Sequence, residues 1–171
     1  MAEPGFNVHV DFDKPPEMEF NRRIMRRALV KIGETHMTDS RQLISRAGRS
    51  RPGENPARQT GLLAKSIGYA IPSATKKRAG LMVKIAPNQK RGRGKTAHII
   101  GDFYPAFLFY GVRRGAWGMS KKQRRSGAHH KSGWRIAPRK NYMTETLQRR
   151  SAWTRSVLED ALRKSLRAVK K

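Results

Sequence analysis

Residues 92–96 have the types that could bind a nucleotide phosphate, because Gly-Arg-Gly-Lys-Thr matches the end of a P-loop. In a P-loop, glycine amides surround the phosphates and the lysine neutralises their charge. The full pattern requires a glycine five positions before Gly94, where this chain has Gln89, and a helix after the loop. The residues after Thr96 do not have a helical pattern. We therefore interpret the segment as a basic loop and expect no cofactor.

Two further pairs could suggest metal binding or hydrolysis. His129 and His130 are adjacent, and adjacent histidines rarely ligate one metal ion; no carboxylate lies close to them in sequence. Glu159 and Asp160 are also adjacent, and on a helix neighbouring side chains diverge by about 100°. The chain has no cysteine, which excludes disulfides and cysteine-ligated zinc. We expect no metal site, no catalytic residues and no enzyme activity.

Positive charge dominates the chain, with 38 Lys and Arg against 12 Asp and Glu and a net charge of +26. Between Glu54 and Glu145 the only acidic residue is Asp102. A single domain with this charge repels itself and favours association with a polyanion. The basic field therefore belongs mainly to the middle of the chain, and we expect an anionic partner.

The cations of this middle part fall in clusters that could face DNA or an acidic protein. Lysine and arginine contacts to phosphates give salt-dependent binding without sequence preference. Trp117 and Trp134 lie among them and could stack on bases or anchor a loop on a neighbouring subunit. The candidate partner-facing residues are Lys76, Lys77, Arg78, Lys90, Arg91, Arg93, Lys95, Arg113, Arg114, Lys121, Lys122, Arg124, Arg125 and Arg135.

The length of 171 residues suits one domain over residues 1–171, with an N-terminal arm at 1–16 and an extended basic loop at 113–140. Apolar residues recurring every fourth position predict a helix from residue 17 to about 37, continuing as far as 44, with acids in its first turn. The same periodicity predicts a helix over 144–169. We expect neither a signal peptide nor a membrane span.

Strand patterns lie between and before these helices. Alternation predicts a strand over 8–12, and an antiparallel hairpin formed by 67–71 and 81–85 with a basic tip. Residues 97–100 suggest a further strand, and 103–112 an aromatic run that is strand or short helix. The fold class predicted is α+β: an N-terminal helix, a small mostly antiparallel sheet, a C-terminal helix and long basic loops.

Three segments of the chain resemble, in order, motifs of the tail-completion (head–tail joining, or neck) family of tailed phages. Residues 60–67 match a Thr-Gly-x-Leu-x-x-Ser-Ile motif, and 104–112 resemble Tyr-Ala-x-Tyr-Val-Glu-Phe-Gly-Thr. Residues 138–143 lie where the family has an Ala-Arg-Pro-Phe-Leu turn before its last helix. The motif residues carried over are Thr60, Gly61, Leu62, Ser66, Ile67, Tyr104, Phe107, Tyr110, Gly111, Arg139 and Tyr142.

Each motif has a physical rationale. Thr60 can cap a short helix beginning at Gly61, whose freedom allows a tight turn. We expect the aromatic run to supply the core of a small sheet, with Gly111 ending it. Arg139 is expected to open the last helix segment.

The resemblance implies a virion structural protein that forms a ring, a hexamer, at the head–tail junction. Such a ring joins the tail tube to the head connector around the DNA channel. It implies contacts with other copies, with neighbouring neck and tail-tube proteins and, without sequence preference, with double-stranded DNA. The basic clusters would then face the channel or a neighbouring ring.

Two other classes of function are compatible with parts of the sequence. A cytoplasmic nucleic-acid-binding protein without sequence preference would explain the charge, although it would not explain the three motifs in register. A phage nuclease would need an acidic cluster for metal-assisted phosphoryl transfer, which the sequence does not present.

Overall fold

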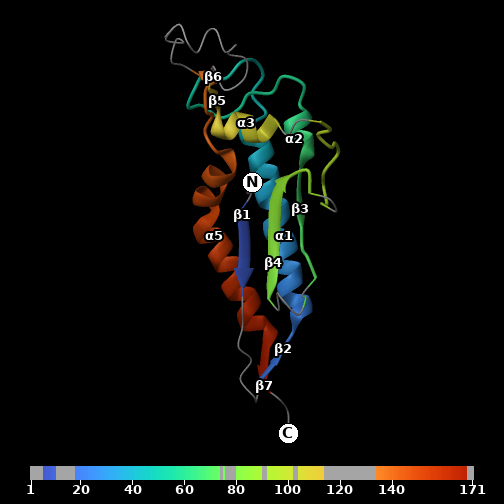
Figure 1. Cartoon of the computed structure of the whole chain (residues 1–171). Coiled ribbons are helices and arrows are strands. Elements are labelled where there is room, and N and C mark those ends of the chain that lie inside the picture. The colour runs from blue at the N-terminus through green and yellow to red at the C-terminus, as the bar shows by residue number, and fades with distance from the viewer. Residues whose placement is uncertain are drawn as a thin grey trace, which may run out of the picture.

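Two long helices and a three-stranded sheet form most of the fold in the computed structural model, which describes residues 6–10, 18–73, 75, 80–89, 92–101, 104–113 and 134–168. The architecture is the predicted α+β class (Figure 1). The elements are β1 (Phe6–Val10), β2 (Met18–Phe20), α1 (Arg22–Leu43), α2 (Leu62–Ser66), β3 (Ile67–Ala70), β4 (Leu81–Pro87), α3 (Tyr104–Tyr110), β5 (Val112–Arg113), β6 (Trp134–Ile136), α5 (Tyr142–Ser165) and β7 (Leu166–Ala168).

The helices α1 and α5 run antiparallel along the length of the molecule (Figure 1). Each begins at an asparagine whose side-chain oxygen accepts hydrogen bonds from the first free amides of the helix. Asn21 Oδ1 accepts from the amides of Arg23 and Ile24, and Asn141 Oδ1 accepts from the amide of Met143 at 3.0 Å. These caps fix where both helices start.

The predicted start of the first helix and the predicted end of the last helix were wrong by several residues, whereas the predicted continuation of the first helix as far as 44 agrees with α1 ending at Leu43. Residues 18–20, expected in the first turn of a helix, form β2, and residues 166–168, expected in the last helix, form β7. The two strands pair antiparallel, with Phe20 opposite Leu166. This short ribbon closes one end of the molecule, because it joins the start of α1 to the end of α5 (Figure 1). The expected acids in the first turn of α1 are likewise absent.

The sheet has the order β1-β4-β3 and is antiparallel throughout. The predicted hairpin is confirmed, with Tyr69 opposite Ile85. The strand predicted over 8–12 is confirmed for residues 8–10, which belong to β1, with Val8 opposite Val83; residues 11 and 12 lie outside the described residues. Leu81, Val83 and Ile85 are buried while the residues between them are half-buried, as the alternation predicts. This buried face packs against α1 and forms the core.

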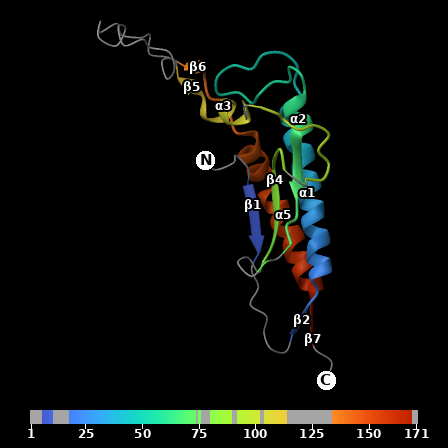
Figure 2. The ribbon, with the colours of Figure 1, turned by 45° about the vertical axis from the view of Figure 1, so that its right-hand side comes forward.

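The end of the molecule opposite the β2–β7 ribbon is built from short elements. There α2, α3, the β5–β6 pair and the irregular segment 45–61 gather above the helix pair (Figures 1 and 2). Residues 97–100, predicted as a strand, form none, because the side chain of Asn88 takes the place of a partner strand at Ile99. Asn88 Nδ2 donates to the Ile99 carbonyl at 2.8 Å, and its Oδ1 accepts from the Ile99 amide at 2.8 Å.

Among the described residues no helix is both long enough and apolar enough to cross a membrane.

Candidate functional site

The three motif segments meet around one cleft at the α2–α3 end of the molecule. The cleft has a volume of about 540 Å³. Its lining includes Thr60, Gly61 and Leu62 from the first segment, Tyr104 from the second and Arg139 from the third. The fold therefore brings together residues that lie far apart in the sequence.

The first segment forms a turn followed by the predicted short helix, α2, but the predicted start was wrong by one residue: the helix begins at Leu62, and Gly61, not Thr60, is its N-cap. Gly61 has a positive φ of 77°, which favours glycine, and it precedes the helix and does not belong to it. The Leu62 amide donates to Thr60 Oγ1 at 3.3 Å. Ser66 is buried and donates to the Leu63 carbonyl, while Ile67 is fully buried in the core. The buried residues Ser66 and Ile67 thus fix this wall of the cleft to the sheet.

Tyr104 connects all three segments. A hydrogen bond with the Leu63 backbone ties its hydroxyl to the first segment; it lowers the pKa of Tyr104, which burial raises by more. Burial, and to a lesser degree the proximity of Tyr104, raise the pKa of Tyr142 in the third segment. Both phenols are therefore neutral hydrogen-bonding groups, and neither is a base at neutral pH.

The aromatic run is the helix α3, so the expectation that it forms the core of a small sheet was wrong. Phe107 is 40% exposed and Tyr110 is 56% exposed, because an isolated helix of this length has only one face against the molecule. Trp134 of β6 is 42% exposed, and the guanidinium of Arg113 lies 5.3 Å from its ring centroid. Three large aromatic side chains are thus left partly uncovered at this end.

Gly111 ends α3 as predicted, for a reason that only the structure shows. Its φ is 73°, and its amide donates to the Phe107 carbonyl at 2.9 Å. A Cβ at this position would lie 2.9 Å from the carbonyl oxygen of Ile136 and 2.8 Å from the Trp134 ring. Only glycine lets the chain leave α3 so close to the returning strand.

Arg139 lies in a turn held from both sides. Its amide donates to the Leu108 carbonyl at 2.7 Å, the amide of Gly53 donates to the Pro138 carbonyl and the amide of Lys140 donates to the Glu54 carbonyl. The expectation that Arg139 opens the last helix was wrong, since Asn141 caps that helix. The Nε and Nη1 atoms of Arg139 are buried and have no hydrogen-bond partner.

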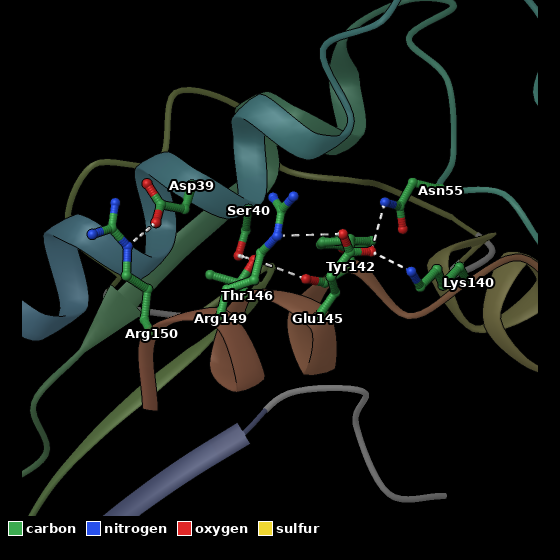
Figure 3. A network of polar contacts seen from close by, with 9 residues as sticks. All are labelled: Asp39, Ser40, Asn55, Lys140, Tyr142, Glu145, Thr146, Arg149 and Arg150. Atoms are coloured by element: carbon green, nitrogen blue, oxygen red, sulfur yellow. Dashed lines mark hydrogen bonds and ion pairs between the residues drawn. The ribbon is translucent and has the colours of Figure 1, made fainter. Parts of the chain in front are cut away.

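A network of polar side chains connects this turn to the two helices (Figure 3). Glu145 accepts a hydrogen bond from Asn55 at 2.9 Å and lies 3.0 Å from the ammonium of Lys140. These contacts, the Asn55 hydrogen bond first, lower the pKa of Glu145. Farther along the helices, Arg150 pairs with Asp39 at 2.6 Å.

Four of the predicted partner-facing cations lie in the described residues, and two of them make contacts within this chain. Lys95 is half-buried and its ammonium donates to the Gln89 carbonyl. The backbone of Arg93 pairs with that of Tyr69, and its side chain hydrogen-bonds the hydroxyl of the same tyrosine. Arg113 and Arg135 are exposed at the β5–β6 pair. The fold therefore places these four cations in two separate regions (Figure 1).

The other predicted cations lie outside the described residues, as do Trp117, His129 and His130. These cations are Lys76, Lys77, Arg78, Lys90, Arg91, Arg114, Lys121, Lys122, Arg124 and Arg125. In the part of the chain that the structure describes, no three His, Asp or Glu side chains gather as they would around a metal ion.

Sequence reasoning did not single out Arg49, Arg58 or Asn55, which complete the cleft and its support. They lie in an irregular segment whose composition predicts a loop but not which neighbours that loop contacts. Only the density of arginine in this segment could have drawn attention to it.

Comparisons with protein-family models, with curated proteins and with solved structures each return no match for this chain.

Proposed function

We propose that this chain is a virion structural protein of a tailed phage, a neck or tail-completion subunit that assembles as a hexameric ring at the head–tail junction. The observation that carries the proposal is the meeting of the three family-like segments around one cleft. Residues as distant as Thr60, Tyr104 and Arg139 line the same cavity. Three short motifs that matched by chance would have no reason to meet.

The surface around the cleft suits assembly. Phe107, Tyr110 and Trp134 leave large aromatic areas in water, and such residues are enriched at protein interfaces. Arg113 and Arg135 flank them. In the proposed ring this end contacts another subunit or an adjoining ring, and the net charge of +26 is compensated by DNA in the channel or by acidic neighbours.

A structural role, and not a catalytic one, is supported by how the acids are used. Asp39 pairs with Arg150, Glu145 with Lys140 and Glu159 with Arg155. Carboxylates engaged in this way hold the fold and its surface together. They are not gathered to bind a metal or to transfer a proton.

The test is the assembly state of the purified chain, observed by negative-stain electron microscopy and native mass spectrometry at physiological ionic strength. We expect closed rings from the wild type. The double variant Arg113→Glu with Arg135→Glu should lose them while its circular dichroism stays that of a folded chain. Arg163→Glu with Lys164→Glu, the same change of charge at two exposed residues in the last turn of α5, is the matched control and should retain rings.

A chain that stays monomeric at all concentrations and binds DNA with a steep salt dependence would contradict this proposal. That result would favour the nucleic-acid-binding alternative, because salt-dependent phosphate contacts need no ring.

A further inference from the structure

The cleft between α2, α3 and the turn at Arg139 has a one-sided charge. Arg49, Arg58 and Arg139 line it, and none of the described residues of its lining is acidic. Its volume of about 540 Å³ lies within the ordinary range of ligand sites. Much of the remaining wall is apolar, formed by Ile44, Pro56, Ala57, Leu62, Leu63, Ala64, Tyr104 and Leu108.

Arg139 is the unusual member of this wall. Its Nε and Nη1 atoms are buried without an acceptor, whereas buried polar groups of folded proteins nearly always have one. Backbone hydrogen bonds hold the turn on both sides, so the main chain that carries this guanidinium is fixed. A charged donor held in this way is complementary to an anion brought in from outside.

We propose that this cleft binds a carboxylate-bearing segment of an acidic neighbouring protein. Arg139 receives the carboxylate, and the apolar wall receives a hydrophobic side chain next to it. Guanidinium and carboxylate match each other in a planar, two-point hydrogen-bond geometry. The identity of the neighbour as another virion protein rests on the proposed function, whereas the binding chemistry does not.

Among the residues whose side chains the structure describes, a second copy of this chain offers few free carboxylates. Most acids whose side chains the structure describes are already engaged: Glu34 accepts from Tyr69, Glu54 from the Arg51 amide, Asp39 pairs with Arg150, Glu145 with Lys140 and Glu159 with Arg155. A chain of charge +26 also repels its own copies, so charge complementarity favours a different, acidic protein.

Duplex DNA matches the cleft less well. Its phosphates could reach a guanidinium, but they bring no apolar group for Leu62, Leu63 and Leu108 to contact. A peptide with an acidic and an aliphatic side chain can contact both the arginines and the apolar side chains that line the cleft.

The test is an NMR titration of the full chain, labelled with 15N, with N-acetyl-Leu-Glu-Leu-amide as the probe. The matched control peptide carries Gln in place of Glu. We expect the acidic peptide to shift the Arg139 Nε–H signal and the amides of Leu62 and Leu108, with an affinity at least about tenfold above that of the control peptide. Arg139→Met should remove that difference, and Arg163→Met, at an exposed arginine of α5 outside the cleft, should keep it.

Equal affinity of the two peptides, or unchanged binding by Arg139→Met, would overturn the proposal. A short DNA duplex that shifts Arg139 where the acidic peptide does not would assign the cleft to phosphate instead. Loss of self-association in Arg139→Met would assign it to a second copy.

If Arg139→Met fails to fold, the difference in affinity between the two peptides for the wild type still tests the proposal. A merely structural arginine would lower the melting temperature when replaced, whereas removal of an unpartnered buried charge should leave it unchanged or raise it. Failure of ring formation would contradict the proposed function and leave the peptide result standing.

Discussion

The two halves of this molecule differ in how completely they cover their large hydrophobic side chains. The body consists of α1, α5 and the β1-β4-β3 sheet, and the motif end consists of residues 44–66, 104–113 and 134–140. In the body, Leu29, Ile32 and Val83 are fully buried. Between its helices Ser40 donates to Thr146 and Asp39 pairs with Arg150, although the buried Nε of Arg41 has no partner. At the motif end, Trp134 is partly uncovered and two buried atoms of Arg139 have no partner.

From this difference we infer that the body mainly determines the stability of the fold and that the motif end mainly determines assembly. The body contains most of the buried apolar surface and therefore supplies most of the stability. In the proposed assembly, the exposed aromatic side chains and Arg139 of the motif end are the groups that another molecule contacts. Substitutions in the body should change the free energy of unfolding, and substitutions of exposed groups at the motif end should change binding.

The largest expected effect is the removal of a core side chain from the body. Ile32 is fully buried between α1 and the sheet, so Ile32→Ala should lower the free energy of unfolding by about 2–5 kcal/mol, since it leaves a cavity. Ile100→Ala makes the same chemical change at a side chain that is 90% exposed, and it should stay within about 0.5 kcal/mol of the wild type. Urea unfolding followed by circular dichroism measures both. Similar losses in the two variants would erase the distinction between body and surface.

The next effect concerns the backbone of the motif end. Gly111→Ala forces an alanine into a positive φ, which costs about 1–2 kcal/mol, and places its Cβ against the Ile136 carbonyl, which adds about 1–3 kcal/mol. Gly53→Ala has the same sign of φ but nothing within 4 Å of its Cβ, so only the first cost applies. Urea unfolding should rank Gly111→Ala below Gly53→Ala. The reverse order would show that α3 and β6 do not approach as closely as described.

The sequence predicted the body far better than the motif end, because the body is built from regular periods. Apolar spacing of nearly four residues located α1 and α5, and alternation located the hairpin formed by β3 and β4. Both signals are local. The start of α1 and the end of α5 were predicted wrongly because β2 and β7 pair with each other from opposite ends of the chain, and a local sequence pattern does not indicate such pairing.

The motif end was predicted only as a set of important residues. The resemblance pointed to Thr60, Tyr104 and Arg139, but not to the cleft that they share with Arg49 and Arg58. A seven-residue aromatic run is compatible with a strand or a helix, and packing against the rest of the molecule decides which forms. The burial of the unpartnered Arg139 atoms depends on how three segments of the chain pack together, and a local sequence pattern does not indicate that packing.

A smaller effect is expected where the helices of the body meet. Ser40 donates to Thr146 Oγ1 at 3.2 Å, and Thr146 donates to the Tyr142 carbonyl; both hydroxyls are buried. Thr146→Val should cost about 1–2 kcal/mol, because Ser40 loses its acceptor while the shape is nearly kept. Ser151→Ala, which removes an exposed hydroxyl of α5, is the control and should change stability by less than about 0.5 kcal/mol. A Thr146→Val variant as stable as its control would mean that the hydrogen bond between Ser40 and Thr146 does not stabilise the contact between α1 and α5.

The smallest effect tests the connection between the two halves, which depends on Glu145. Its hydrogen bond with Asn55 and its ion pair with Lys140 lower its pKa below the ordinary 4.5, so the unfolded chain takes up the proton first as the pH falls. The stabilisation is therefore fully present above about pH 4.5 and is lost as the pH falls through the lowered pKa. Glu145→Gln keeps an acceptor for Asn55 and loses the charge, so it should cost less than about 1 kcal/mol at neutral pH, since Lys140 is largely exposed.

The same variant should unfold with a weaker pH dependence than the wild type below pH 4.5, in thermal unfolding recorded across that range. His36 in the body provides an internal control. Burial, as the largest cause, lowers its pKa from 6.5, so its contribution is lost as the pH falls from 6.5 in both proteins alike. Curves that run parallel above pH 4.5, with the wild type the more stable, and that converge below it would locate the acid-sensitive contact at the junction of the motif end and the body. Curves that stay parallel throughout would mean that Glu145 does not hold the two together.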